Sequence, residues 1–122
     1  MHPYKRSERV ASLLQREIAG FLERDLKDPR LKKITITKVQ LTDDLKLARI
    51  YYSLIGTEQE KLESEKVLNR AKGMIKRLIG ERIYLRFVPE LEFRFDQNLE
   101  YSQKIEDLIK KIHEQKEPNS ED

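Results

Sequence analysis

Positive charge gathers around one short stretch near the middle of the chain, Ala71-Lys72-Gly73. A glycine inside a helix costs about 1 kcal/mol relative to alanine and lets the backbone leave helical angles, so we expect two short helices that meet here at a kink. Such a kink can direct backbone N–H groups and cations at a phosphate. The alternative is an ordinary amphipathic helix that ends at a glycine cap and restarts. The cations around this stretch are Lys66, Arg70, Lys72, Lys76 and Arg77.

The distribution of charge along the chain favours a polyanionic partner. Residues 66–86 hold seven Lys or Arg against one acidic residue, whereas residues 100–122 hold four basic residues against seven acidic ones. One-sided positive charge attracts nucleic acid because binding releases condensed counterions. A solvated charged surface is the alternative, since 39% of the chain is charged. The local excess of six positive charges makes nucleic acid the better interpretation.

Several cations are candidates for contact with RNA phosphates. They are Arg70, Lys72, Lys76 and Arg77 around the kink, Lys5, Arg6 and Arg9 near the N-terminus, and Arg82 and Arg86 beyond the kink. The first group ranks highest. Ala71 and Gly73 are assigned to the shape of the kink, so a β-branched residue at position 73 is expected to strain it and weaken binding. The N-terminal group could lie beside the kink, if the first helix packs behind the sheet, or form a disordered basic start. The last group could extend the surface or pair with Glu81 and Glu90.

Other residue types indicate packing or turns rather than chemistry. Six aromatic residues could stack on bases, namely Tyr51, Tyr52, Tyr84, Phe87, Phe93 and Phe95. Alternating aromatic residues on a three-stranded sheet are usually core, so most of the six are expected to be buried, with Tyr51 and Tyr84 exposed. Asp43-Asp44 is expected to form a hairpin turn rather than a metal site. The chain has no cysteine, its two histidines stand at positions 2 and 113, and no P-loop, GxSxG or zinc-ligand spacing occurs. The sequence therefore predicts neither an enzyme nor a metal or cofactor site.

The pattern of apolar residues predicts an α+β domain. Helical spacing, β-branched runs and breaks at Pro or Gly divide the chain into segments. These are a helix over 7–26, strands over 34–41 and 45–55, helices over 58–70 and 74–80, a strand over 91–96 and a short C-terminal helix over 101–112. The order α-β-β-α-(kink)-α-β predicts a three-stranded sheet with helices on one face. We assign residues 1–114 to a single domain and 115–122 to a flexible acidic tail.

Local signals should fix the ends of these elements. Ser7 and Thr57 are expected to cap the first and second helices. The apolar phase of the first strand shifts near Lys38, which indicates a bulge or a strand end there. The first two strands are close enough in sequence to form an antiparallel hairpin. Residues 81–90, which Pro89 interrupts, should be an edge strand or a connection.

The order of elements, with a helix–kink–helix between the second and third strands, resembles the type II KH fold of RNA-binding domains. KH domains carry a GXXG loop that clamps the nucleic-acid backbone, at the position where this chain reads Ala71-Lys72-Gly73. That variant of the kink resembles the ribosome-binding factor A family. The other matching stretches are 9–11 (RVA), 27–31 (KDPRL), 39–51 (VQLTDDLKLARIY) and, most specifically, 85–96 (LRFVPELEFRFD). The resemblance covers roughly residues 5–112.

This resemblance implies a bacterial assembly factor that binds the free small (30S) ribosomal subunit through its 16S rRNA. It also implies that the factor helps the 5′ end of that RNA mature, leaves before translation, has no catalytic activity and is linked to growth in the cold. Ribosomal proteins and assembly GTPases are further candidate partners. A non-catalytic protein–protein adaptor and a KH-like binder of another RNA are the alternatives. The lack of a membrane-length apolar run or a signal-peptide core favours a cytoplasmic protein, and a monomer is expected.

Overall fold

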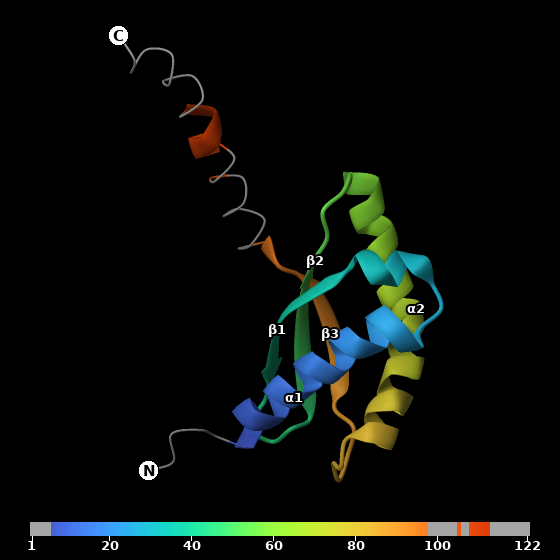
Figure 1. Cartoon of the computed structure of the whole chain (residues 1–122). Coiled ribbons are helices and arrows are strands. Elements are labelled where there is room, and N and C mark those ends of the chain that lie inside the picture. Colours follow the sequence, from blue (N-terminus) through green and yellow to red (C-terminus); the bar gives the residue numbers. More distant parts are fainter. Residues whose placement is uncertain (1–5, 98–104, 106–107, 113–122) are drawn as a thin grey trace.

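The computed structural model describes residues 6–97, 105 and 108–112. The elements, in chain order, are α1 (Arg6–Gly20), a π-helical turn (Phe21–Asp25), a 3-10 helix (Pro29–Lys33), β1 (Thr35–Leu41), β2 (Leu47–Ser53), α2 (Glu58–Arg82) and β3 (Glu90–Phe95). Figure 1 shows α1 running across the sheet and α2 lying beside β3. The first helix was predicted over 7–26, and the helical backbone does continue past Gly20 to Asp25, with the last turn widened to a π-helix.

One face of the sheet is buried against both helices. Core side chains come from every element, and they include Leu14 and Ile18 of α1, Ile36 and Val39 of β1, Ala48, Ile50 and Tyr52 of β2, Leu68, Ile75 and Ile79 of α2, and Leu91 of β3. The alternate strand residues Lys38, Arg49 and Arg94 are exposed on the other face, as the two-residue period of a strand requires. The predicted α+β class, with helices on one face of three strands, is confirmed.

The central strand β2 joins two kinds of pairing. It pairs antiparallel with β1, so the predicted hairpin is confirmed, and parallel with β3, which α2 connects to it. The register between β1 and β2 shifts between Ile36 and Lys38, so the predicted bulge is also confirmed. Asp43 and Asp44 lie in the hairpin turn. The Asp44 carboxylate accepts hydrogen bonds from the Thr42 hydroxyl at 2.6 Å and the Lys46 N–H at 3.0 Å, which explains why this turn holds acidic residues.

The predicted break at Ala71-Lys72-Gly73 is wrong, because α2 is one continuous helix through this stretch. Leu68 and Ile75, on either side of it, have no exposed surface and belong to one core. Burying each of these side chains is worth about 1.5–3 kcal/mol, which outweighs the cost of about 1 kcal/mol for glycine in a helix. Ala71 also packs against the core. The buried apolar side of α2 therefore keeps the helix continuous at Gly73, where the helix propensity is lowest.

Because the helix is continuous, neither the backbone conformation nor the packing at position 73 requires glycine. Gly73 is exposed, its φ is negative, and an added Cβ would meet no atom within 4 Å. We expect Gly73→Ala to stabilise the protein by about 0.5–1 kcal/mol, because alanine lowers the entropy of the unfolded chain and favours the helix. Urea denaturation would measure the change, and RNA affinity should stay unchanged. A loss of stability would show that the backbone at position 73 leaves helical angles.

The two predicted helix caps have different outcomes. Thr57 caps α2 as predicted, in a reciprocal arrangement in which its hydroxyl accepts from the Glu60 N–H at 3.1 Å while the Glu60 carboxylate accepts from the Thr57 N–H at 3.1 Å. Ser7 is not a cap. It lies inside α1, is buried, and donates its hydroxyl to the Asp43 carboxylate at 3.2 Å. Ser7 therefore links the start of α1 to the β1–β2 turn.

The Glu60 cap makes stability depend on pH. Hydrogen bonds from Thr57 hold the pKa of the Glu60 carboxyl below its ordinary value of 4.5. A carboxylate whose folded pKa is lowered contributes stability that is complete above its unfolded pKa and is lost as pH falls through the folded value. Glu60→Gln should therefore lose less stability than the wild type when urea denaturation is compared at about pH 7 and about pH 3. Equal losses would assign the acid sensitivity to other carboxylates.

The remaining predictions concern the last third of the chain. Residues 83–89 form a connection that leads from α2 into β3, one of the two forms predicted for this segment. Residues 105 and 108–112 are helical and exposed, in agreement with a C-terminal helix. The rest of that helix and the predicted tail over 115–122 lie outside the described residues.

Candidate nucleic-acid interface

The continuous helix α2 divides the highest-ranked cations between two of its sides. Residues seven apart lie on the same side of a helix, so Arg70 and Arg77 share the outer side, where both are exposed. Residues four apart also align, so Lys72 and Lys76 share a flank, and the contact of Lys76 with Glu90 shows that this flank faces β3. The cations therefore surround the solvent side of α2 rather than converging on a kink. We call Arg70, Lys72, Lys76 and Arg77 the α2 cations.

Two of the α2 cations take part in ion pairs. The Lys76 ammonium lies 2.9 Å from the Glu90 carboxylate at the start of β3, and this hydrogen bond lowers the pKa of Glu90. The Arg77 guanidinium lies 3.8 Å from Glu81 one turn later, with both side chains well exposed. An exposed ion pair of this kind contributes little to stability, so the Arg77 guanidinium can exchange Glu81 for a phosphate at little cost.

The other two α2 cations, Arg70 and Lys72, form no ion pair within the described part of the chain. They still act at longer range, because Arg70 contributes to the lowered pKa of Asp28 and Lys72 to the lowered pKa of Glu90, in both cases as a smaller cause than a direct hydrogen bond. Their positive charge is therefore only partly balanced by the protein itself. These two side chains are the best placed to attract an external phosphate.

Arg82 has a structural contact that sequence reasoning missed. Its guanidinium donates two hydrogen bonds to the Asp25 carboxylate, at 3.0 and 3.2 Å, and lies 5.2 Å from the ring centroid of Phe21. These hydrogen bonds to the Asp25 carboxylate raise the pKa of Arg82. Neither of the predicted partners, Glu81 or Glu90, is its ion-pair partner. Because Asp25 and Arg82 are 57 residues apart, no local pattern could reveal this link between the π-helical turn after α1 and the end of α2.

Arg82→Ala is accordingly expected to affect stability more than RNA binding. The substitution removes both hydrogen bonds to Asp25 and the stacking on Phe21, so the midpoint of thermal unfolding should fall by a few degrees. Arg86→Ala, which removes an exposed guanidinium from the next segment, should leave the midpoint almost unchanged. A larger thermal effect of Arg86→Ala would contradict the structural assignment of Arg82.

Arg6 and Arg9, the two described N-terminal cations, lie over the opposite edge of the sheet from the α2 cations. Arg6 and Arg9 are exposed at the start of α1, which packs on the edge strand β1, whereas α2 packs on the edge strand β3 (Figure 1). The structure therefore does not place Arg6 and Arg9 beside Ala71-Lys72-Gly73. Lys5 lies outside the described residues.

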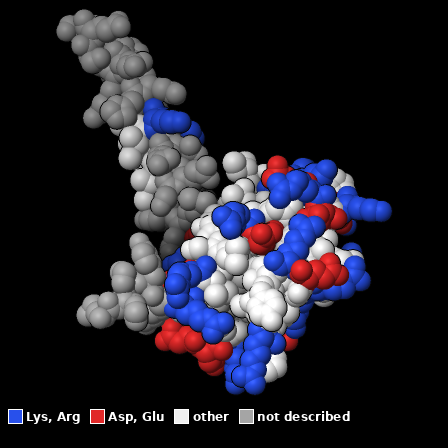
Figure 2. All heavy atoms as spheres, turned by 60° about the horizontal axis from the view of Figure 1, so that its bottom comes forward, with Lys and Arg blue, Asp and Glu red and all other residues white. Residues whose placement is uncertain are grey.

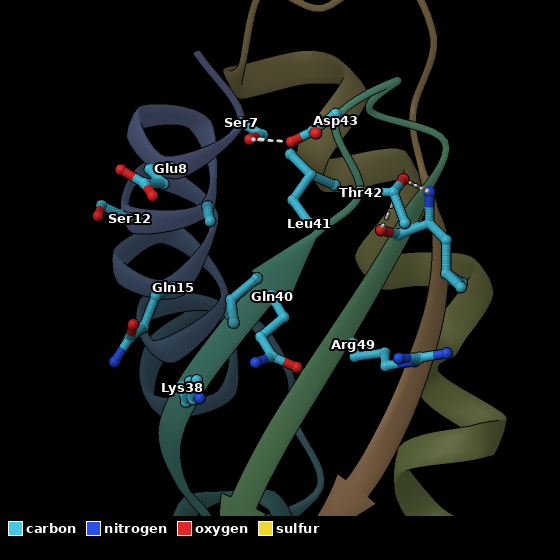
Figure 3. A pocket seen from close by; sticks show the side chains of 13 residues that line it. Ser7, Glu8, Ser12, Gln15, Lys38, Gln40, Leu41, Thr42, Asp43 and Arg49 are labelled. Atoms are coloured by element: carbon cyan, nitrogen blue, oxygen red, sulfur yellow. Dashed lines mark hydrogen bonds between the residues drawn. The ribbon is translucent and has the colours of Figure 1, made fainter. Parts of the chain in front are cut away.

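A groove of about 580 Å³ runs between the first half of α1 and the outer edge of β1 (Figure 3). Its lining includes the charged residues Glu8, Lys38, Asp43 and Arg49. At one point the Gln15 amide crosses from α1 to donate a hydrogen bond to the Thr37 carbonyl at 3.3 Å, which satisfies the backbone at the bulge. Because its lining holds two acidic and two basic side chains, the groove carries no excess of positive charge that would favour a polyanion.

The exposed aromatic residues were predicted only in part. Tyr84 is fully exposed, as expected, while Tyr51 is half-buried and donates its hydroxyl to the Gln40 amide at 3.3 Å. Phe87 was assigned to the core and is 69% exposed, with the Arg86 guanidinium 5.4 Å from its ring centroid. In the sequence, Ile83, Leu85 and Phe87 alternate with charged or polar residues as in a strand, but residues 83–89 are not a strand, so the alternation does not bury Phe87.

Among the described residues, no cluster of three His, Cys, Asp or Glu side chains could hold a metal ion. The described helices also include none with both the length and the apolar character needed to cross a bilayer.

The order and pairing of the helices and strands define the class of this domain. Two parallel strands joined by a long helix, preceded by a helix and an antiparallel strand, form a KH-like α+β domain of the type II order. The chain belongs to the ribosome-binding factor A family, whose model matches residues 6–109. A relative from Syntrophobacter fumaroxidans, named ribosome-binding factor A, is 47% identical over 90% of this chain and 96% of its own. One from Staphylococcus carnosus is 44% identical over 88% and 94% of the two chains.

Solved structures agree with this membership. A solution structure of a Thermotoga maritima protein, described as a putative ribosome binding factor A, is 35% identical, covers 77% of this chain and 90% of its own, and gives a TM-score of 0.65. The crystal structure of ribosome-binding factor A from Thermus thermophilus is 26% identical, covers 73% and 93% of the chains, and gives 0.64. A homology model of the Thermus thermophilus factor was fitted into a cryo-EM map of a 30S–RbfA complex. It is 29% identical, covers 68% of this chain and 87% of its own, and gives a TM-score of 0.56.

Proposed function

We propose that this protein binds the free small ribosomal subunit through 16S rRNA and assists a late step of its assembly. The observation that carries the proposal is the similarity to the Thermus thermophilus factor, which was fitted into a map of a 30S complex. Family membership over residues 6–109 supports the same conclusion. We further propose that the protein acts in the cytoplasm as a monomer and without catalysis, by holding or reshaping RNA.

The α2 cations support binding through RNA. They surround the solvent side of a rigid helix, and Arg70 and Lys72 keep charge that the described part of the chain does not pair. Phosphate contacts from such side chains fix the position of a protein on RNA and dominate the affinity, whereas base contacts are optional. Lys76 and Arg77 would exchange their carboxylate partners for phosphates. Arg6 and Arg9 form a separate and weaker candidate surface, and Lys5, which precedes them in the sequence, stays a candidate. Arg86 adds a further cation near the C-terminal end of α2.

We propose maturation of the 16S rRNA 5′ end as the step that the protein assists. The test is complementation of a bacterial strain that lacks its own ribosome-binding factor A, grown in the cold, with primer extension across the 5′ end of 16S rRNA. The wild-type chain should restore mature ends and growth. Restored subunit binding with unprocessed 5′ ends would contradict the maturation role and leave the binding role intact.

A further inference from the structure

The connection between α2 and β3, residues 83–89, presents aromatic side chains that the core does not use. Tyr84 is 104% exposed and Phe87 is 69% exposed, whereas every other Tyr or Phe among the described residues is buried or half-buried. Large apolar side chains that gather on the surface mark interaction sites in soluble proteins. We call residues 83–89 the aromatic loop.

The aromatic loop is anchored at both ends. The Ile83 N–H donates to the Ile79 carbonyl at 2.8 Å, and Ile83 itself is buried. At the other end Pro89 is fully buried, and the Glu90 N–H donates to a backbone carbonyl of the β1–β2 turn at 2.8 Å. Val88 packs over Gly80, where an added Cβ would lie 3.4 Å from its methyl group. Tyr84 and Phe87 are therefore presented by a fixed backbone, so binding through them costs little ordering entropy.

The charge around the aromatic loop fits an anionic partner with flat rings. Residues 83–89 contain Arg86 and no acidic residue, whereas Arg82 just before them is paired with Asp25. Arg86 stacks on Phe87 and forms no ion pair with the described residues, so its N–H groups remain available. Figure 2 turns the lower end of Figure 1 forward and shows uncharged surface in the middle of this face, with Lys and Arg around it and acidic side chains between them. Lys76, one of the α2 cations, also lies near this end of the molecule, because it pairs with Glu90, the residue that follows the aromatic loop.

We propose that the aromatic loop binds unpaired bases of RNA, with Tyr84 and Phe87 each stacking on a base and Arg86 binding a neighbouring phosphate. This inference rests on the proposed function and specifies that the RNA at the end of α2 is single-stranded. Every base has a flat face that an aromatic ring can cover, whereas the bases of a duplex are already stacked on one another. The α2 cations need only phosphates and can bind either form.

The test replaces both aromatic residues by leucine, because leucine keeps an apolar side chain of similar size but cannot stack. Binding of a labelled 12-nucleotide uridine-rich single strand and of a duplex of equal length would be measured for the wild type and for Tyr84→Leu/Phe87→Leu. Stacking predicts a loss of at least about fivefold per base on the single strand and no change on the duplex. The matched control is Ile55→Ala/Leu62→Ala, which removes exposed apolar side chains near the opposite end of α2 (Figure 1) and should change neither.

A second readout does not depend on affinity. The chain has no tryptophan, so Tyr84→Trp introduces a single indole whose fluorescence should be quenched when the single strand stacks on it. Equal affinity of the leucine variant and the wild type, with no quenching, would overturn the stacking inference. It would leave the proposed function intact if both proteins still bind free small subunits in a salt-sensitive way. Absence of both RNA and subunit binding by the wild type would overturn the two together.

Discussion

Replacing Arg70, Lys72, Lys76 and Arg77 together by alanine should lower the affinity for free small subunits by about 100-fold or more at 0.1 M salt. Each lost phosphate contact removes about 0.7–0.9 from the slope of log affinity against log salt, so the slope should fall by about 3. The loss has a second cause, because removing Lys76 leaves the Glu90 carboxylate, now without its 2.9 Å partner, beside the RNA. A salt titration of binding, followed by sedimentation or by fluorescence anisotropy, measures both quantities.

A control of equal charge separates the site from the general attraction of any cation. Arg16, Lys27, Lys38 and Lys46 are exposed and lie outside α2. Changing these four to alanine alters the net charge by the same amount. If the α2 cations form the interface, the control should lose much less affinity and keep most of the salt slope. Equal losses for the two variants would show that binding has no defined basic face on α2. Circular dichroism would confirm that both variants are folded.

Phe21→Ala is expected to destabilise the protein by about 3–5 kcal/mol, a large share of the 5–15 kcal/mol typical of a domain. Phe21 has no exposed surface, lies in the π-helical turn after α1, and supports the Arg82 guanidinium on its ring. The substitution creates a cavity at the point where the end of α1 meets the end of α2. Urea denaturation at 25 °C measures the free energy of unfolding.

Tyr84→Ala provides the matched control for this second substitution. It removes a similar ring from a fully exposed position, so the free energy of unfolding should change by less than about 0.5 kcal/mol. Similar destabilisation by both substitutions would mean that Phe21 is not the packing centre that the structure indicates.

Local sequence patterns predicted those parts of the fold that depend on neighbouring residues. The β-branched run before Lys38 and the phase shift near it predicted both β1 and its bulge, because side-chain alternation is a property of the strand itself. The Thr57 cap followed from a threonine that stands directly before a helix. The acidic pair Asp43-Asp44 predicted the hairpin turn because aspartate binds the backbone of its own turn.

The errors arise where tertiary contacts decide the outcome. Gly73 signals a break only by propensity, and the buried stripe through Leu68 and Ile75 overrides it. Ser7 has the residue type of a helix cap, but its hydroxyl binds the Asp43 carboxylate instead. The candidate site was predicted as a set of residues. Its division into an outer side and a flank of α2, and the pairing of Arg82 with Asp25, follow only from the three-dimensional structure.

The most direct test of the central claim is co-sedimentation of the wild-type protein with purified free small subunits and, separately, with assembled ribosomes, at low and at raised salt. Binding to free 30S subunits through rRNA predicts that the protein sediments with them at low salt, is released as salt rises, and sediments little with assembled ribosomes. Equal sedimentation with both particles, or none with free small subunits, would contradict an assembly factor that acts before translation.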